Sequence, residues 1–229
     1  MLRFTLLGTP QISLEGEPLV ALSSQKAQAL LFYLVTTAPT DARRPIPQSR
    51  DAIATLLWGE MPDVKAKQNL RAVLPDLRRH MGDHLLIARQ TIAFDHTLPY
   101  WLDVKVLQER LSPTAWATRT AADSAAELAA RQAALDLYRG EFLSGFYVHN
   151  APAFEAWVLA QREQLHALVL EASFAIVQEY IRAGNFTAAL AASRRLLALE
   201  PWSEPAHRQQ MVLLAQTGAR AAALAQYET

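Results

Sequence analysis

Hydrophobic and polar positions alternate in short runs over the first part of the chain and then change to a helical period. The runs end at Gly8-Thr9-Pro10 and at Glu15-Gly16-Glu17, which are typical turn sequences. They predict three short strands, at residues 3–7, 11–14 and 18–22. A longer apolar run over residues 24–37 predicts a helix after these strands.

Two further helices follow, separated by a turn that contains Gly59 and Pro62. The first covers residues 49–58, where the hydroxyl of Ser49 suits an N-cap. In the second, five apolar residues fall within one arc of roughly 100° when they are placed at 100° per residue. These residues are Leu70, Val73, Leu74, Leu77 and Met81. The two segments together predict a helix-turn-helix.

A hairpin comes next in the sequence. Gly82-Asp83 ends the third helix, and residues 85–88 and 91–94 are short β-prone runs on either side of Arg89-Gln90. A hairpin directly after a helix-turn-helix is a wing. We therefore expect residues 1–100 to form a winged helix-turn-helix domain.

The third helix also concentrates positive charge. Between residues 65 and 79 the only acid is Asp76, and the cations are Lys65, Lys67, Arg71, Arg78 and Arg79. Five cations against one acid give this segment a local charge of +4, whereas the whole chain has a formal net charge of zero. A solvated basic face on an amphipathic helix explains this charge by itself. The preceding helix and the wing favour the alternative, a helix that faces nucleic acid.

The second half of the chain is helical and repetitive. The segment GNFTAALA, which begins at Gly184, recurs as GARAAALA at Gly218. This spacing of 34 residues is the tetratricopeptide period, in which each repeat is a helix pair. Small residues at Ala189 and Ala223 allow the paired helices to approach closely.

Other segments complete this half. We expect a third repeat copy around Ala134 and Tyr138, and a long helix or helix pair over residues 152–182. The predicted fold class is mainly α with a small β component, with an all-α, tetratricopeptide-like domain over residues 101–229. Residues 221–229 lie in the middle of a repeat helix without a polar cap, so we expect the chain to be truncated at its C-terminus.

This ordered series of elements resembles the SARP-type transcriptional regulators. The resemblance is carried by LRFTLLGTPQISLEGEPL, SQKAQALLFYLV, DAIATLLWGEMP and KQNLRAVLPDLRRHMGD in the first half. It continues through WLDVKVLQERL and LDLYRGEFLSGF to the helical repeats. The resemblance implies a response-regulator-like winged helix followed by a bacterial transcriptional activation domain. It also implies dimeric binding to direct repeats in promoter DNA and contact with RNA polymerase.

A winged helix on duplex DNA places its third helix in the major groove. The predicted groove or phosphate contacts are Lys67, Gln68, Arg71 and Arg78, because arginine suits guanine and glutamine suits adenine. Arg89 at the wing tip would reach a minor groove or a phosphate, and Lys65 and Arg79 would contact the backbone. The expected partners are therefore double-stranded DNA, RNA polymerase or another protein at the repeats, and a second copy of the chain.

Pro75 argues against this simple interpretation, because proline in a helix interior removes a backbone hydrogen bond at a cost of about 3 kcal/mol. Three alternatives stay open. The helix kinks around DNA, or it starts later than predicted, or the domain has lost DNA binding and the protein is an interaction or signalling module of a larger regulator.

Sequence motifs do not favour an enzyme. The chain contains no GxxxxGK[ST], HExxH or GxSxG motif and no cysteine, and its six histidines are dispersed. We expect no cofactor and no metal. The N-terminal segment is broken by Gly8 and Pro10, and no apolar run is long enough to span a membrane, so we expect a cytoplasmic protein.

Overall fold

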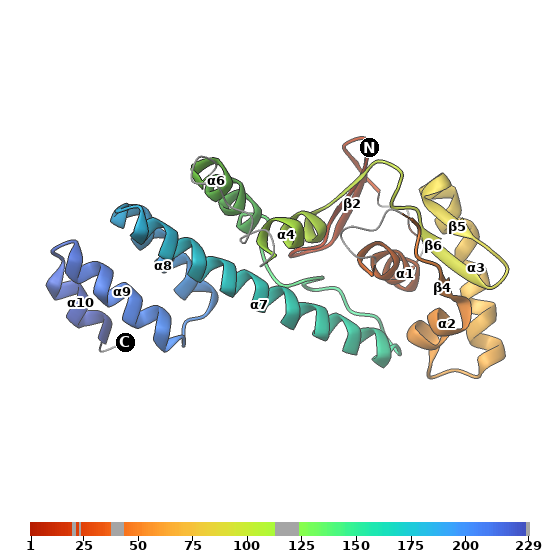
Figure 1. Cartoon of the computed structure of the whole chain (residues 1–229). Coiled ribbons are helices and arrows are strands. Elements are labelled where there is room, and N and C mark those ends of the chain that lie inside the picture. The colour runs from red at the N-terminus through yellow and green to blue at the C-terminus, as the bar shows by residue number, and fades with distance from the viewer. Residues whose placement is uncertain (20–21, 23, 38–43, 113–123, 228–229) are drawn as a thin grey trace. The chain divides into compact units, whose positions relative to one another are not determined.

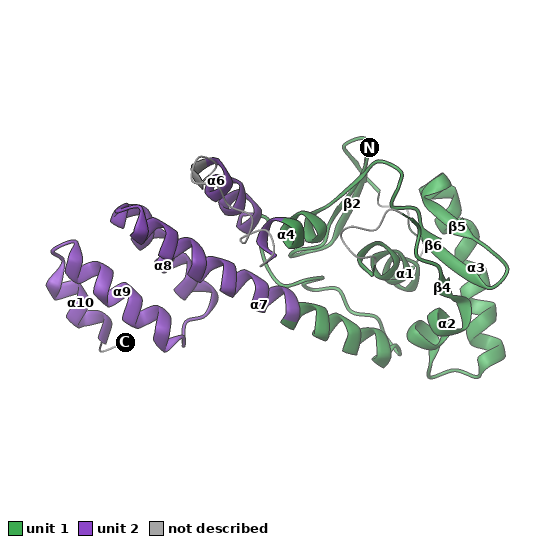
Figure 2. Ribbon diagram, viewed as in Figure 1, with its two compact units in different colours: residues 1–109, 137–163 green, residues 110–136, 164–229 purple. Residues whose placement is uncertain are grey.

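The structure is a computed structural model that describes residues 1–19, 22, 24–37, 44–112 and 124–227. It divides into two compact units (Figure 2), of which unit 1 comprises residues 1–109 and 137–163, and unit 2 residues 110–136 and 164–229. The segments of the two units alternate along the sequence. The domain boundary that we expect between residues 100 and 101 stays a prediction.

The N-terminal strands form a four-stranded sheet in the order β3-β2-β1-β7. Its strands are β1 (Leu2–Thr5), β2 (Gln11–Leu14), β3 (Glu17–Pro18) and β7 (Tyr100–Leu102). β1 and β2 form an antiparallel hairpin with Leu2 opposite Leu14, whereas β7 pairs with β1 in parallel. Of the predicted third strand, residues 18–22, Pro18 lies in β3 and Leu19 and Leu22 lie outside it, whereas residues 20 and 21 lie outside the described residues. β3 lies at the edge of the sheet, where proline is tolerated because its missing N–H faces away from the ladder.

The three predicted helices are present, in order, as α1 (Gln25–Thr36), α2 (Arg50–Trp58) and α3 (Asp63–Met81) (Figure 1). The hydroxyl of Ser24 accepts a hydrogen bond from the backbone N–H of Ala27, and the hydroxyl of Ser49 accepts one from Asp51. These bonds satisfy backbone donors at the helix starts that have no partner within the helix. α3 ends at Gly82, whose φ of 55° suits glycine.

The predicted wing is a hairpin of β5 (Leu85–Ile87) and β6 (Thr91–Phe94). A strand that the sequence does not predict, β4 (Gln48–Ser49), pairs with β6 and gives a second sheet in the order β4-β6-β5. Phe94 of the wing contacts Phe4 of β1 edge to face, with ring centroids 5.8 Å apart. This contact joins the core under the wing to the N-terminal sheet. The order of helices α1 to α3 followed by the β5–β6 hairpin confirms the predicted winged helix-turn-helix.

Asp103 ties the N-terminal sheet to the helix α4 (Asp103–Leu111). Its side chain is fully buried and accepts hydrogen bonds from the backbone N–H groups of Leu6 at 2.7 Å, Leu7 at 2.9 Å and Val104 at 2.8 Å. Three donors aimed at one carboxyl group fix the chain at the end of β1.

The prediction of a third repeat copy around Ala134 and Tyr138 is wrong. The helix α6 (Ser124–Leu135) ends before Tyr138, and the following segment is irregular and belongs to unit 1. There Phe142 is buried and forms a β-bridge with Leu7. A Cβ atom on Gly140 would lie only 3.3 Å from Gly8, so the two backbones approach at a distance that glycine permits.

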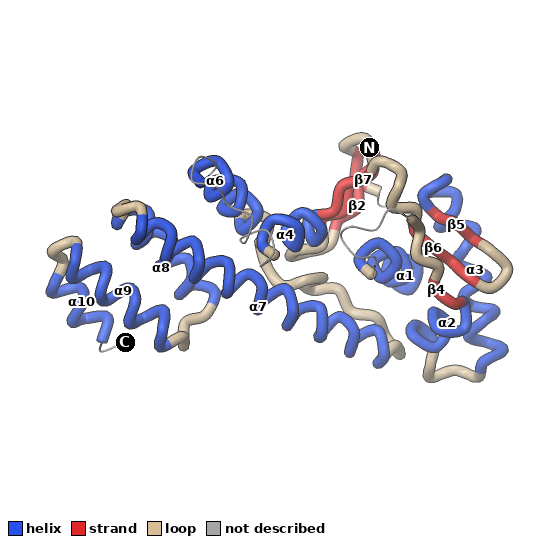
Figure 3. The backbone as a smooth tube through the Cα atoms, in the orientation of Figure 1, coloured by secondary structure: helices blue, strands red, loops and turns tan. Residues whose placement is uncertain are grey.

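Within the described residues, the secondary structure of unit 2 is helical and all strands lie in unit 1 (Figure 3). The segment over residues 152–182 is one helix, α7 (Pro152–Arg182), whose residues 152–163 belong to unit 1. It is followed by α8 (Phe186–Leu199), α9 (Glu204–Gln216) and α10 (Arg220–Tyr227).

The two predicted repeats are confirmed by their turns and by their small buried residues. Gly184 and Gly218 precede α8 and α10 with φ of 69° and 85°, and Ala189 and Ala223 are buried. The predicted fold class, mainly α with a small β component, is therefore confirmed. Within the described residues, no helix has the length and apolar character needed to cross a membrane.

Candidate nucleic-acid interface

α3 separates an apolar face from a polar one, as its sequence period predicts. Its buried residues are Ala66, Leu70, Leu74, Leu77 and Met81. The exposed positions include the predicted contacts Lys65, Gln68, Arg71, Arg78 and Arg79. A helix held by one face and exposed along the other has the form that a groove of duplex DNA accepts.

Three predicted residues meet at one hollow of about 340 Å³ between α2, α3 and the wing tip. Lys67 and Arg71 contribute to it from α3, and Arg89 contributes from the turn between β5 and β6. The backbone N–H of Arg50 donates to the carbonyl of Gln90 at 2.9 Å, which holds the wing turn against the start of α2. Segments about 20 residues apart in sequence therefore present their cations to one place.

Arg50 also lines this hollow and is not among the contacts predicted from the sequence. The residue stands alone after the N-cap Ser49, so no period or charge cluster marks it. Its Nε atom is buried and has no hydrogen-bond partner among the described residues. A buried donor of a charged group without a partner is unusual and suits an anion that binds there.

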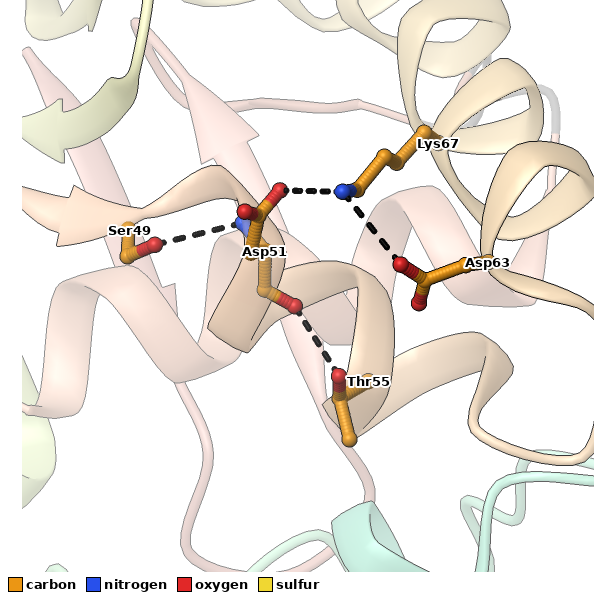
Figure 4. A network of polar contacts seen from close by, with 5 residues as sticks. All are labelled: Ser49, Asp51, Thr55, Asp63 and Lys67. Atoms are coloured by element: carbon orange, nitrogen blue, oxygen red, sulfur yellow. Dashed lines mark hydrogen bonds and ion pairs between the residues drawn. The ribbon is translucent and has the colours of Figure 1, made fainter.

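Lys67 differs from the other cations because two carboxylates bind it (Figure 4). Its Nζ lies 3.0 Å from Oδ1 of Asp51 in α2 and 3.4 Å from Oδ2 of Asp63, one turn earlier in α3. Hydrogen bonding to Asp51 and the charge of that carboxylate, followed by the same effects of Asp63, raise the pKa of Lys67. Lys67 therefore links the two helices in the free protein.

The remaining predicted contacts lie elsewhere on α3. Arg78 lines a second hollow, of about 390 Å³, beside the wing strands and Pro45 and Pro47. The guanidinium of Arg79 forms an ion pair with Asp76 at 2.6 Å. Lys65 is exposed in the first turn. The predicted set thus spreads along the helix, and only Lys67, Arg71 and Arg89 share one hollow.

Pro75 lies on the exposed face of α3, and the helix continues through it from Asp63 to Met81. The alternative that the helix starts later than predicted is therefore wrong. Proline leaves the carbonyl of Arg71 without its helical donor. On an exposed face water can supply that donor, so the missing hydrogen bond costs less than it would in a buried helix.

The described residues contain no group of three or more His, Cys, Asp or Glu side chains that could hold a metal ion.

Comparisons with known proteins give a family for the second half of the chain and a fold for the whole. Residues 102–229 match the family described as bacterial transcriptional activator domain. The structure is similar to that of Mycobacterium tuberculosis EmbR, solved in complex with a low-affinity phosphopeptide, with 22% sequence identity and a TM-score of 0.68. The match covers 99% of this chain and 58% of the EmbR chain, so the chain spans less than two thirds of that protein. No curated protein sequence matches the chain.

Proposed function

Because the chain belongs to the bacterial transcriptional activator domain family and is a SARP-type transcriptional regulator, we propose that it activates transcription by binding promoter DNA through α3 and the wing. The observation that carries the proposal is the convergence of three arginines, Arg50, Arg71 and Arg89, on one hollow beside the exposed face of α3. Lysine and arginine bind phosphate oxygens, and an exposed helix beside them can enter the major groove.

We assign the contacts according to exposure and partners. Gln68, Arg71 and Arg78 are exposed on α3 and reach base edges or phosphates in the major groove. Arg89 at the wing tip reaches an adjacent minor groove or phosphate. Lys65 and Arg79 contact the DNA backbone, which fixes the register of the helix without reading sequence.

The helical repeats contribute protein contacts in this proposal. The last helical hairpin exposes large apolar side chains, namely Trp202, Val212, Leu224 and Tyr227. Exposed apolar groups of this size support an interface with a second copy of the chain or with RNA polymerase. Sedimentation that finds only monomer at high protein concentration would contradict the dimer.

The proposal is tested by titrating the full chain with a duplex from its own promoter region and with an unrelated duplex, over a series of salt concentrations. Arg71→Ala should weaken binding by about 1 to 3 kcal/mol on the promoter duplex alone if Arg71 reads a base, and on both duplexes if it contacts only phosphate. Arg220→Ala, which removes an equal charge from α10, is the matched control and should leave binding unchanged. Affinity that does not depend on salt would contradict binding by the basic helix.

Pro75 supports one alternative, an interaction or signalling module that does not bind DNA. Its ring occupies the middle of the face that would enter the groove. A wild-type protein without DNA affinity at low salt would favour this alternative.

A further inference from the structure

The ion pairs of Lys67 set it apart from every other cation at its hollow. Asp51 and Asp63 hold its Nζ from two different helices, at 3.0 and 3.4 Å. Among the described residues no ion pair involves Arg50, Arg71 or Arg89, which line the same hollow. One of the four cations is therefore already neutralised by protein carboxylates.

Both carboxylates are exposed beside Lys67. The Asp51 side chain is 74% exposed and lines the hollow, and the Asp63 side chain is 82% exposed. Packing against buried residues therefore does not fix the position of either carboxylate. Each carboxylate is instead held near Lys67 by its helix, since Asp51 follows the N-cap Ser49 and Asp63 is the first residue of α3.

We propose that Asp51 and Asp63 compete with DNA phosphates for Lys67 and thereby lower the affinity of this protein for duplex DNA of any sequence. This inference rests on the proposed function. Lys67 then lies on the helix that contacts DNA, but its ion pairs with Asp51 and Asp63 reduce its binding to phosphate. The two carboxylates set how strongly the hollow attracts a polyanion.

The size of the effect follows from counterion release. The logarithm of the binding constant falls with the logarithm of salt concentration, with a slope of about −0.9 for each phosphate that is neutralised. Counterion release contributes nothing to the binding constant at about 1 M salt. At about 0.15 M salt, one additional phosphate contact therefore raises the binding constant about fivefold. Exposed ion pairs are weak, so their loss does little to the fold while it frees this cation.

The test compares the full chain with the double variant Asp51→Asn, Asp63→Asn on two unrelated duplexes over a range of salt. We expect binding about fivefold tighter near 0.15 M salt, and a slope steeper by about 0.9, on both duplexes. Adding Lys67→Met to the double variant should abolish the gain. The matched control is Glu15→Gln, Glu17→Gln, which removes the same charge near the β2–β3 turn and should change affinity less than about twofold.

The single variant Asp51→Asn should shift affinity and slope in the same direction by a smaller amount, and it serves if the double variant fails to fold. Asp51→Glu, which keeps the charge, should retain the wild-type slope. Unchanged or weaker binding by folded amide variants overturns the inference, as does a gain that survives Lys67→Met. If the wild type binds DNA and the variants show no gain, only this inference fails. If neither binds at low salt, the proposed function fails with it.

Discussion

Asp103 provides a test of the fold through pH. Burial of its side chain, opposed by the hydrogen bonds from Leu7, Val104 and Leu6, raises the pKa of this carboxyl group from 3.8 to about 6. The folded protein therefore holds the Asp103 proton more tightly than the unfolded chain does. Between these two pKa values the unfolded chain has already lost the proton, so the free energy of unfolding falls as pH rises.

A pKa difference of about 2 units corresponds to about 3 kcal/mol, at about 1.4 kcal/mol per unit. This stability is fully present below about pH 4 and is lost by the time the pH passes about 6. Asp103→Asn removes the titration. The amide cannot accept from all three backbone N–H groups, so the variant should also lose about 1 to 3 kcal/mol at every pH.

The assay is urea unfolding of wild type and Asp103→Asn between about pH 3.5 and 7, followed by tryptophan fluorescence, to which the buried Trp58 contributes. The variant should be markedly less stable than wild type at the acidic end, and the difference should shrink by about 3 kcal/mol as pH rises. A difference that is constant with pH, or that grows as pH rises, would show that burial does not raise this pKa.

His96 should act in the opposite direction in the same pH range. Burial, followed by the charge of Lys105, lowers the pKa of His96 from 6.5 to about 4. The free energy of unfolding should therefore fall as the pH drops through this interval. His96→Asn should remove that fall in the same urea titrations. Pro75→Ser should restore one hydrogen bond to the carbonyl of Arg71 and stabilise the protein by about 1 kcal/mol or more, which thermal unfolding measures. DNA titration of Pro75→Ser should show altered sequence preference; DNA binding that only this variant possesses would support the interaction module instead.

The sequence by itself predicts helix ends, helix faces and turns, because at these places a residue acts on its immediate neighbours. Ser24 and Ser49 mark the starts of α1 and α2, and Gly82 marks the end of α3, because caps depend on backbone groups within a few residues. The apolar stripe of α3 and the glycines of the repeats follow from local period in the same way. These signals determined the order of the helices, the wing and the fold class.

Contacts between distant segments were decided only by the tertiary structure. β7 is three residues without alternation, and it becomes a strand because β1, almost 100 residues earlier, supplies its hydrogen bonds. The segment around Phe142 resembles a repeat helix locally, yet its bridge to Leu7 outweighs that tendency. The sequence predicts Lys67 as a contact from its charge and its position on the third helix. Its pairing with Asp51 depends on how α2 and α3 cross, which no residue pattern along either helix specifies.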